Sequence, residues 1–80
     1  QNLIIKSFEN SVQIDLTSAG NYSINLYSEN LKLISSLNLS FLEKGINSIP
    51  INFSNLPLGV YFLEIKGVKS TDYIKILLEK

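Results

Sequence analysis

Apolar and polar residues alternate one by one along most of this chain, and that period of two constrains its fold more than any other feature. Successive side chains of a β-strand point to opposite faces of the sheet, so alternation is typical of a strand with one buried face. A helical spacing of apolar residues occurs nowhere in the sequence. The sequence therefore predicts strands at residues 3–8, 12–16, 22–27, 32–39, 48–53, 61–66 and 73–79.

Segments rich in Gly, Asn or charged residues separate these runs, as expected of turns. Short strands at a spacing of roughly 8–12 residues are typical of a sandwich, in which two sheets bury their apolar faces against each other. We therefore predict an all-β, immunoglobulin-like antiparallel β-sandwich of about seven strands, formed by residues 1–80 as a single domain. Pro50 has no N–H to donate, so its strand is expected at an edge or with a bulge.

The composition excludes most kinds of catalytic and metal site. The chain has neither His nor Cys, which removes imidazole and thiolate nucleophiles or bases and the usual zinc ligands. No Ser lies in a nucleophile-elbow or Ser-x-x-Lys context. Acidic residues are scattered singly, which disfavours a calcium loop, although two of them could meet across strands. We predict no enzyme activity, no metal and no cofactor. The acidic residues are Glu9, Asp15, Glu29, Glu43, Glu64, Asp72 and Glu79.

Charge and aromatic content narrow the binding functions. Seven basic and seven acidic residues give a net charge of zero, so no long-range field draws the chain to nucleic acid. Tyr22 and Tyr61 are in register with core positions, whereas Tyr27, Phe62 and Tyr73 lie in the opposite register and would form an exposed patch. Such a patch suits stacking on sugar rings, so a carbohydrate-binding module stays an alternative.

Residues 55–63 form the most specific segment of the sequence. Pro57 and Gly59 favour a type I turn over residues 56–59, and Pro57 holds Leu56 extended, so that Leu56 can close one end of the sandwich. Tyr61 then faces inward, and its hydroxyl is expected to bond a backbone carbonyl just upstream, as in the tyrosine corner of immunoglobulin-type folds. Taken alone, these four residues predict a structural corner rather than a binding function.

Several segments in consistent order resemble the C-terminal sorting domains of proteins exported by the type IX secretion system of Bacteroidetes. These segments are residues 20–27, 45–51, 53–65 and 73–80, so the resemblance covers nearly the whole chain. Two features depart from the family pattern. The family hairpin often reads Asp-x-x-Gly followed by a basic residue, where this chain has residues 28–32, and Asn30 is expected to take the positive φ. The Pro-Asn-Pro start common in the family is missing.

The resemblance implies a sorting function rather than catalysis. Such a domain is joined to an N-terminal cargo protein, which reaches the periplasm by a separate signal peptide. The outer-membrane translocon recognises the folded domain, a sortase-like C-terminal signal peptidase removes it, and the cargo is then secreted or attached to the cell surface. The implied partners are the translocon, the peptidase and the cargo, with no nucleic acid and no small-molecule substrate.

The last predicted strand, residues 73–79, is the best candidate for the recognised feature, because apolar residues occupy both of its faces. Ile74, Ile76 and Leu78 face one way, so they can enter the core. Tyr73 and Leu77 face the other way and would form an exposed apolar strip, able to dock in a receptor groove or to add as a strand to a receptor sheet. The alternative is that both faces are covered within the domain. The recognition candidates are Tyr73, Lys75, Leu77, Leu78 and Lys80.

An immunoglobulin-like structural or adhesion module of a secreted protein is the main alternative function. A further domain would follow Lys80 in such a module, whereas a sorting domain would end the natural protein there. The two interpretations share a fold, so they differ in what the outer surface of the sandwich does.

Overall fold

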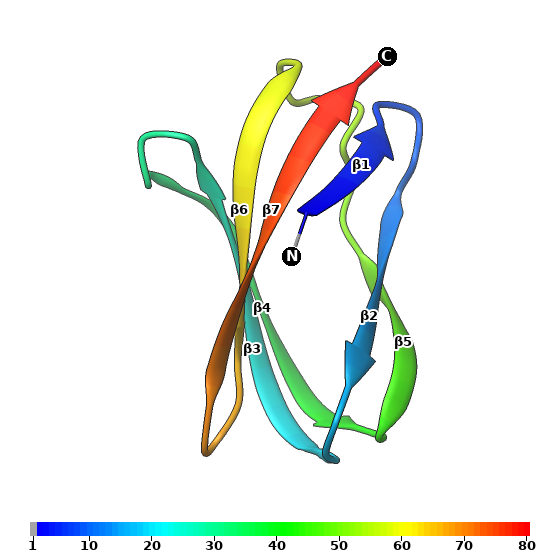
Figure 1. Ribbon diagram of the computed structural model, residues 1–80, viewed down its shortest axis with the longest axis vertical. Coiled ribbons are helices and arrows are strands. Elements are labelled where there is room, and N and C mark those ends of the chain that lie inside the picture. Colours follow the sequence, from blue (N-terminus) through cyan, green and yellow to red (C-terminus); the bar gives the residue numbers. More distant parts are fainter. Residues whose placement is uncertain (1) are drawn as a thin grey trace.

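The computed structural model describes residues 2–80, which form two β-sheets (Figure 1). Five strands make the larger sheet in the order β1-β7-β6-β3-β4, and the smaller sheet pairs β2 with β5. The predicted all-β sandwich is confirmed, with seven strands. Within residues 2–80 no helical segment capable of spanning a bilayer is found. The strands are β1 (Asn2–Lys6), β2 (Ser11–Leu16), β3 (Gly20–Ser28), β4 (Leu33–Leu42), β5 (Gly45–Pro50), β6 (Gly59–Lys66) and β7 (Thr71–Glu79).

Strand direction departs from the prediction at one pair. β1 runs parallel to β7, with Asn2 opposite Lys75 and Lys6 opposite Glu79, whereas the other pairs are antiparallel. The expectation of a wholly antiparallel sandwich is therefore wrong at β1, because a period of two gives the faces of a strand and not its direction. The first and last strands of the sandwich lie side by side at one edge of the larger sheet (Figure 1).

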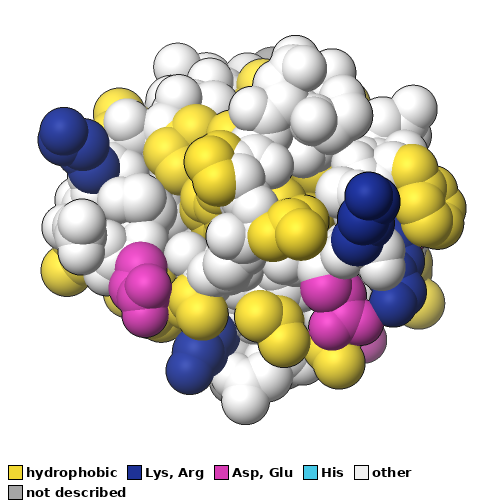
Figure 2. All heavy atoms as spheres, turned by 90° about the horizontal axis from the view of Figure 1, so that it is seen from above, with side chains coloured by type: hydrophobic (Ala, Val, Ile, Leu, Met, Phe, Trp, Pro, Cys, Tyr) yellow, Lys and Arg dark blue, Asp and Glu magenta, His cyan; other side chains and the backbone are white. Residues whose placement is uncertain are grey.

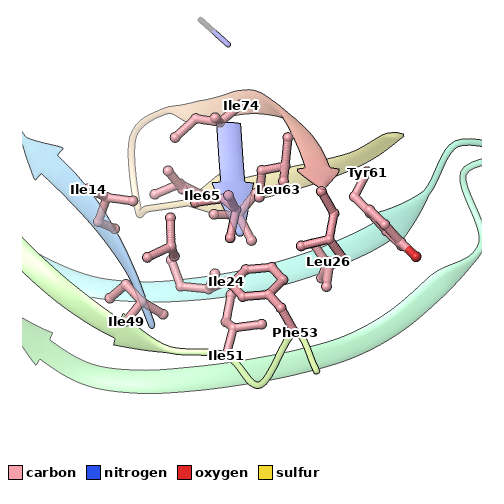
Figure 3. Packing of buried hydrophobic residues seen from close by; sticks show 14 of the residues in the cluster. Ile14, Ile24, Leu26, Ile49, Ile51, Phe53, Tyr61, Leu63, Ile65 and Ile74 are labelled. Atoms are coloured by element: carbon pink, nitrogen blue, oxygen red, sulfur yellow. The ribbon is translucent and has the colours of Figure 1, made fainter. Parts of the chain in front are cut away.

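The core fills the space between the two sheets and comes from every strand except β4, together with the segment after β5. Figure 3 shows the Phe53 ring projecting into the middle of this cluster, close to Ile24. Burying a side chain of this kind stabilises the fold by about 1.5–3 kcal/mol. The buried residues are Ile5, Val12, Ile14, Leu16, Ile24, Leu26, Ile49, Ile51, Phe53, Tyr61, Leu63, Ile65, Ile74, Ile76 and Leu78.

β5 ends at Pro50, three residues before the end of the alternating segment that predicted it. Pro50 is its last residue, and β5 pairs only with β2, which confirms the expected edge position. The pairing then becomes irregular, since the N–H groups of Ile51 and Phe53 donate to the carbonyls of Asn10 and Glu9 at 3.1 and 3.4 Å. Both side chains still enter the core, so the alternation predicted their burial correctly even where the strand has ended.

β4 differs from the prediction in the face of one residue. The alternation places Leu33 with Leu37 and Leu39, but Leu33 lies opposite the outward-facing Tyr27 and is 56% exposed. A register shift between β3 and β4 at that point inserts an extra residue in β4 and reverses the face. A second shift lies towards the other end of β4, and between the two shifts residues 35–39 pair regularly with β3.

The β3–β4 hairpin takes its positive φ at Leu31, where φ is 63°, and not at Asn30 as expected. The Leu31 N–H donates to the Ser28 carbonyl at 2.9 Å, and the Ser28 N–H donates to the Lys32 carbonyl at 2.9 Å. A turn over residues 28–31 therefore ends on a left-handed residue, which is the usual way to close a three-residue hairpin loop. The left-handed position is the fourth of the turn, where the Asp-x-x-Gly pattern has its Gly.

Candidate docking surface on the C-terminal strand

β7 divides its side chains between core and solvent as the alternation predicts. Ile74 and Ile76 are buried, whereas Tyr73 is 58% and Leu77 is 41% exposed, which confirms the exposed face of this strand. Leu78 requires a correction, because it is only 1% exposed and belongs to the core. It has the same parity along the strand as Ile74 and Ile76, so it cannot contact a partner while the sandwich is folded.

The outer face of β7 continues onto both neighbouring strands. Leu77 lies opposite Ile4 of β1 and Val60 of β6, and Lys75 lies opposite Phe62 of β6. Ile4 is 64% exposed. Ile4, Val60, Lys75 and Leu77 line a shallow depression of about 330 Å³, together with Asn2 and Leu3. We call these five residues, Ile4, Val60, Phe62, Lys75 and Leu77, the outer strip. Their arrangement offers apolar contact area with one amino group among the apolar side chains.

The backbone of β7 is paired on both sides where it carries the outer strip. β1 and β6 both pair with residues 75–78, β1 in parallel and β6 antiparallel. A receptor strand cannot add to β7 there, because its backbone donors and acceptors already belong to ladders on either side. Contact with this part of β7 is therefore limited to its outward side chains.

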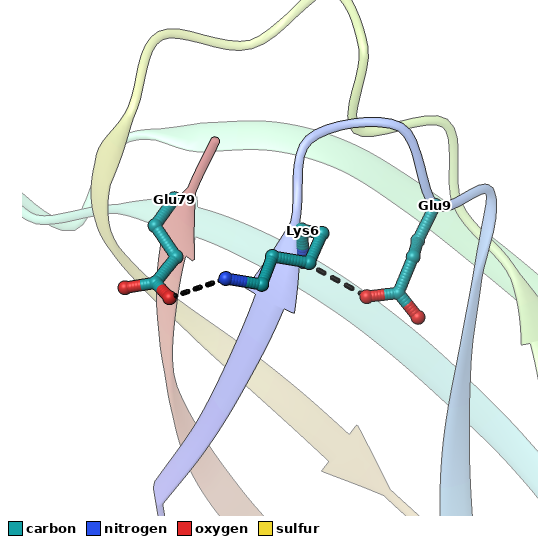
Figure 4. Close-up of polar contacts among 3 residues, drawn as sticks. All are labelled: Lys6, Glu9 and Glu79. Atoms are coloured by element: carbon teal, nitrogen blue, oxygen red, sulfur yellow. Dashed lines mark hydrogen bonds and ion pairs between the residues drawn. The ribbon is translucent and has the colours of Figure 1, made fainter.

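Lys6, at the end of β1, contacts Glu79 of β7 and Glu9 of the following turn (Figure 4). The Lys6 ammonium lies 2.7 Å from a Glu79 carboxylate oxygen, and the Lys6 backbone N–H donates to the Glu9 carboxylate at 2.8 Å. The Ser7 N–H adds a bond to the Glu79 carbonyl at 2.8 Å. Both side chains of the ion pair are more than 40% exposed, so it stabilises the fold by less than about 1 kcal/mol. Its main effect is to fix the ends of β1 and β7 together.

A hydrogen-bonded row around Glu64 crosses the outer face of the larger sheet. The Tyr73 hydroxyl and the Asn25 amide each donate to the Glu64 carboxylate at 2.8 Å. The Ser36 hydroxyl of β4 donates in turn to the Asn25 carbonyl oxygen at 2.5 Å. Bonds from Tyr73 and Asn25 lower the pKa of Glu64, against a smaller opposing effect of burial. The row joins β7 to β4 through β6 and β3.

The three aromatic residues of the possible sugar platform do share the outer face of the larger sheet. Tyr27 lies directly opposite Phe62, and Tyr73 is the opposite neighbour of Glu64 two residues further along β6. The Tyr73 and Tyr27 hydroxyls are bound to Glu64, at 2.8 and 3.4 Å. The hydrogen bond that Tyr73 donates to Glu64 stabilises the protonated hydroxyl and raises the pKa of Tyr73, and burial is the main cause of the raised pKa of Tyr27. These donors act within the sheet, so a sugar would have to displace them.

The predicted tyrosine corner is confirmed. Tyr61 is 5% exposed, and its hydroxyl donates to the Pro57 carbonyl, four residues upstream. Leu56 packs against the core, as expected of a residue that closes an end of the sandwich. Gly59 has a φ of 144°, which favours glycine over residues with a side chain. The turn was predicted at the wrong place. The hydrogen bond that closes it runs from the Leu56 N–H to the Phe53 carbonyl, so the turn covers residues 53–56 and not 56–59.

A second tyrosine corner escaped the sequence analysis. The Tyr22 hydroxyl donates to the Ser18 carbonyl at 2.6 Å, again four residues upstream. Both corners share a Gly-x-Tyr spacing at the start of a strand, with Gly20 and Gly59 each two residues before the tyrosine. This repeated spacing could have revealed the second corner. Both tyrosines are thereby assigned to the fold and not to a binding surface.

On the end of the sandwich drawn in Figure 2, lysine and acidic side chains adjoin one another on the right, and elsewhere they lie among exposed hydrophobic side chains. Across residues 2–80 no three acidic side chains come together as metal ligands. Lys80 is exposed beyond the end of β7.

Fold and surface together define a small β-sandwich with an apolar strip suited to docking. Residues 7–79 match the family model of the secretion system C-terminal sorting domain. The chain belongs to this family, and its β-sandwich is a C-terminal sorting domain of type IX secretion. Membership implies a secreted or cell-surface protein that passes the outer membrane of a member of the Bacteroidetes. No curated protein matches the chain.

Proposed function

We propose that residues 1–80 are a single, non-catalytic sorting domain that directs an N-terminal cargo protein across the outer membrane. The observation that carries this proposal is the outer strip, which places Leu77 of the last strand between Ile4 and Val60. The exposed apolar area can be buried against a receptor groove, and burial of apolar area is the main favourable term in such contacts. Family membership supports the secretion role, and the strip supplies a surface for it.

The strip acts as a side-chain docking surface in this proposal. Leu77 and Ile4 enter the receptor, while Lys75 and Lys80 lie at the polar rim of the contact. Tyr73 is engaged with Glu64 and contributes its ring rather than its hydroxyl. An apolar centre with a charged rim is the usual anatomy of a specific interface. Leu78 is excluded from the contact by its burial.

The wider route follows from the same proposal. The cargo domain precedes the sandwich and reaches the periplasm by its own signal peptide. The outer-membrane translocon of the type IX system binds the folded sandwich, and the sortase-like peptidase cleaves upstream of it. The cargo is then released or retained at the cell surface, and the sandwich acts throughout as a ligand and a substrate.

An export assay tests the outer strip. Residues 1–80 are fused behind a reporter with a periplasmic signal peptide in a type IX-competent bacterium. The double variant I4K/L77K places two charges in the strip, and we expect it to reduce the reporter in the medium about tenfold, equivalent to ~1.4 kcal/mol of docking free energy. Truncation after Ile76 is a poorer test, because it also removes Leu78 from the core.

A matched control uses Ile46, which is 76% exposed on β5 of the smaller sheet. The I46K variant should leave export unchanged, and circular dichroism should show that both variants are folded. Undiminished export of a folded I4K/L77K variant would remove the strip from the proposal. Failure of the unchanged fusion to be exported would instead contradict the sorting function itself.

A further inference from the structure

The free edge of β4 differs from the other edges of the sandwich. β4 pairs with β3 on one side only and is the longest strand, with 10 residues. Natural edge strands are usually protected from pairing by charges, by Pro, by short length or by β-bulges. The two register shifts of β4 lie outside residues 35–39, so they leave this stretch regular. β1 has Lys6, β2 has Asp15, and β5 has Pro50 and only 6 residues, whereas β4 has no charged residue and no Pro.

From this edge we infer that two copies of the chain associate by antiparallel pairing of β4 with β4. The regular part of β4 is residues 35–39, bounded by the two register shifts, and its midpoint is Leu37. In an antiparallel pair, a two-fold axis perpendicular to the sheet brings one residue opposite its own copy. Placing that axis at Leu37 matches the regular residues of one copy with the regular residues of the other.

The exposed side chains at the two ends of β4 complement each other in this arrangement. With the axis at Leu37, Leu33 of one copy lies opposite Phe41 of the other, and this occurs twice by symmetry. Leu33 is 56% and Phe41 is 59% exposed, so each pair would remove apolar surface from water. Aliphatic–aromatic pairs across strands are among the favourable cross-strand contacts. The β4 sequence is therefore complementary to itself when it is reversed.

The charge of the chain permits this association. The net charge is zero, so two copies approach without long-range repulsion. The interface is formed by one strand pair and a few side chains, which places it among small, weak interfaces. The expected dimer therefore forms reversibly and only as the concentration is raised. Its larger sheet would contain ten strands, twice the 5 of one copy.

Analytical ultracentrifugation over a concentration series tests the association. The weight-average mass should rise from 9.0 kDa towards twice that value as the concentration increases. The N38K/S40K variant introduces two exposed charges on the β4 edge and should remain monomeric throughout. The control T17K/S48K adds the same two charges at exposed positions outside β4 and should dimerise like the unchanged chain. A mass that stays at 9.0 kDa, or equal dimerisation of both variants, overturns the proposal.

Disulfide cross-linking tests the register, since the chain has no cysteine of its own. In L37C the two thiols lie across the two-fold axis at the Cα separation that a disulfide needs, about 4.5–5.5 Å. In N38C the two Cα atoms are offset by two residues and lie beyond about 7 Å, which prevents a bridge. We expect a covalent dimer under mild oxidation from L37C alone. Cross-linking of N38C but not of L37C would overturn the Leu37 axis.

Discussion

β7 and β4 are two long strands of the larger sheet that differ in how much of each is buried. They have 9 and 10 residues, yet β7 has three buried side chains and β4 has none. β7 has a partner strand on each side along residues 75–78, and its inner side chains belong to the core. β4 lies at the far edge, where Leu37, Leu39 and Leu42 are only partly buried.

The contrast shows that different strands of one sheet supply the core and the exposed surface. A residue on the inner face of β7 serves the core, and its outward neighbours are free for recognition without any change in strand pairing. β4 contributes less to the core, so its sequence is less constrained by burial. What β4 leaves free is its backbone edge, whereas what β7 leaves free is a row of side chains.

Truncation of a side chain to alanine should give the largest difference in stability between variants of β7 and variants of β4. Ile76 is 0% exposed, so Ile76→Ala should lower the free energy of unfolding by about 3 kcal/mol, through lost burial and the cavity that remains. Leu37→Ala in β4 should cost about 1 kcal/mol, because Leu37 is only partly buried and its surroundings are open. Urea denaturation followed by circular dichroism measures both. Equal losses would contradict the assignment of β7 to the core and β4 to its margin.

The two tyrosine corners extend the comparison of β7 with β4. Tyr61 lies opposite Ile76 of β7, and Tyr22 lies opposite Leu39 of β4. Tyr61→Phe leaves a carbonyl without its partner in a buried corner and should cost about 1.5 kcal/mol. Tyr22→Phe affects an exposed bond and should cost about 0.5 kcal/mol. Thermal and urea unfolding give both values. The reverse order would mean that the exposed corner is the more important one.

The hairpin that leads into β4 should be open to stabilisation. Leu31 has a left-handed backbone, which costs a residue with a side chain about 1–2 kcal/mol, and its side chain is 69% exposed. Leu31→Gly removes this strain at some cost in unfolded-state entropy, so a net gain of about 0.5–1 kcal/mol is expected. Asn30→Gly is the matched control and should give no gain. A midpoint in urea that is unchanged or lower in Leu31→Gly would contradict the assignment.

The smallest expected effect is a pH dependence of the row that joins β7 to β4. Hydrogen bonds from Tyr73 and Asn25 hold the pKa of Glu64 below its ordinary value of 4.5. The stability that they add is fully present above pH 4.5 and decreases as the pH falls through the folded-state pKa of Glu64. Tyr73→Phe should therefore flatten the acid side of the stability curve. Unfolding free energies measured from pH 6 down to pH 3, with the variant and the unchanged chain showing identical slopes, would contradict this role of Tyr73.

Local pattern predicted the strands and their faces well, because burial on one face of a strand leaves a direct trace in the sequence. It also predicted the Tyr61 corner, because the turn residues Pro57 and Gly59 come directly before an inward-facing tyrosine. The parallel direction of β1, the outward position of Leu33 and the left-handed conformation of Leu31 were not predicted correctly. Each of these depends on how two distant or shifted strands pair, and a single residue inserted in one strand changes the outcome. The outer strip combines both kinds of information, since Leu77 was predicted but its neighbours Ile4 and Val60 follow only from the register.

The parallel pairing of β1 with β7 has a mechanical consequence. Asn2 at the start of β1 lies beside Lys75, and Lys6 at its end lies beside Glu79. The chain therefore enters β1 at one end of this ladder and leaves β7 at the other end (Figure 1). A pulling force applied between the two termini therefore slides β1 along β7 and loads the whole ladder at once, instead of peeling the bonds apart one by one. The β1–β7 pairing therefore resists tension applied between the two termini of the sandwich.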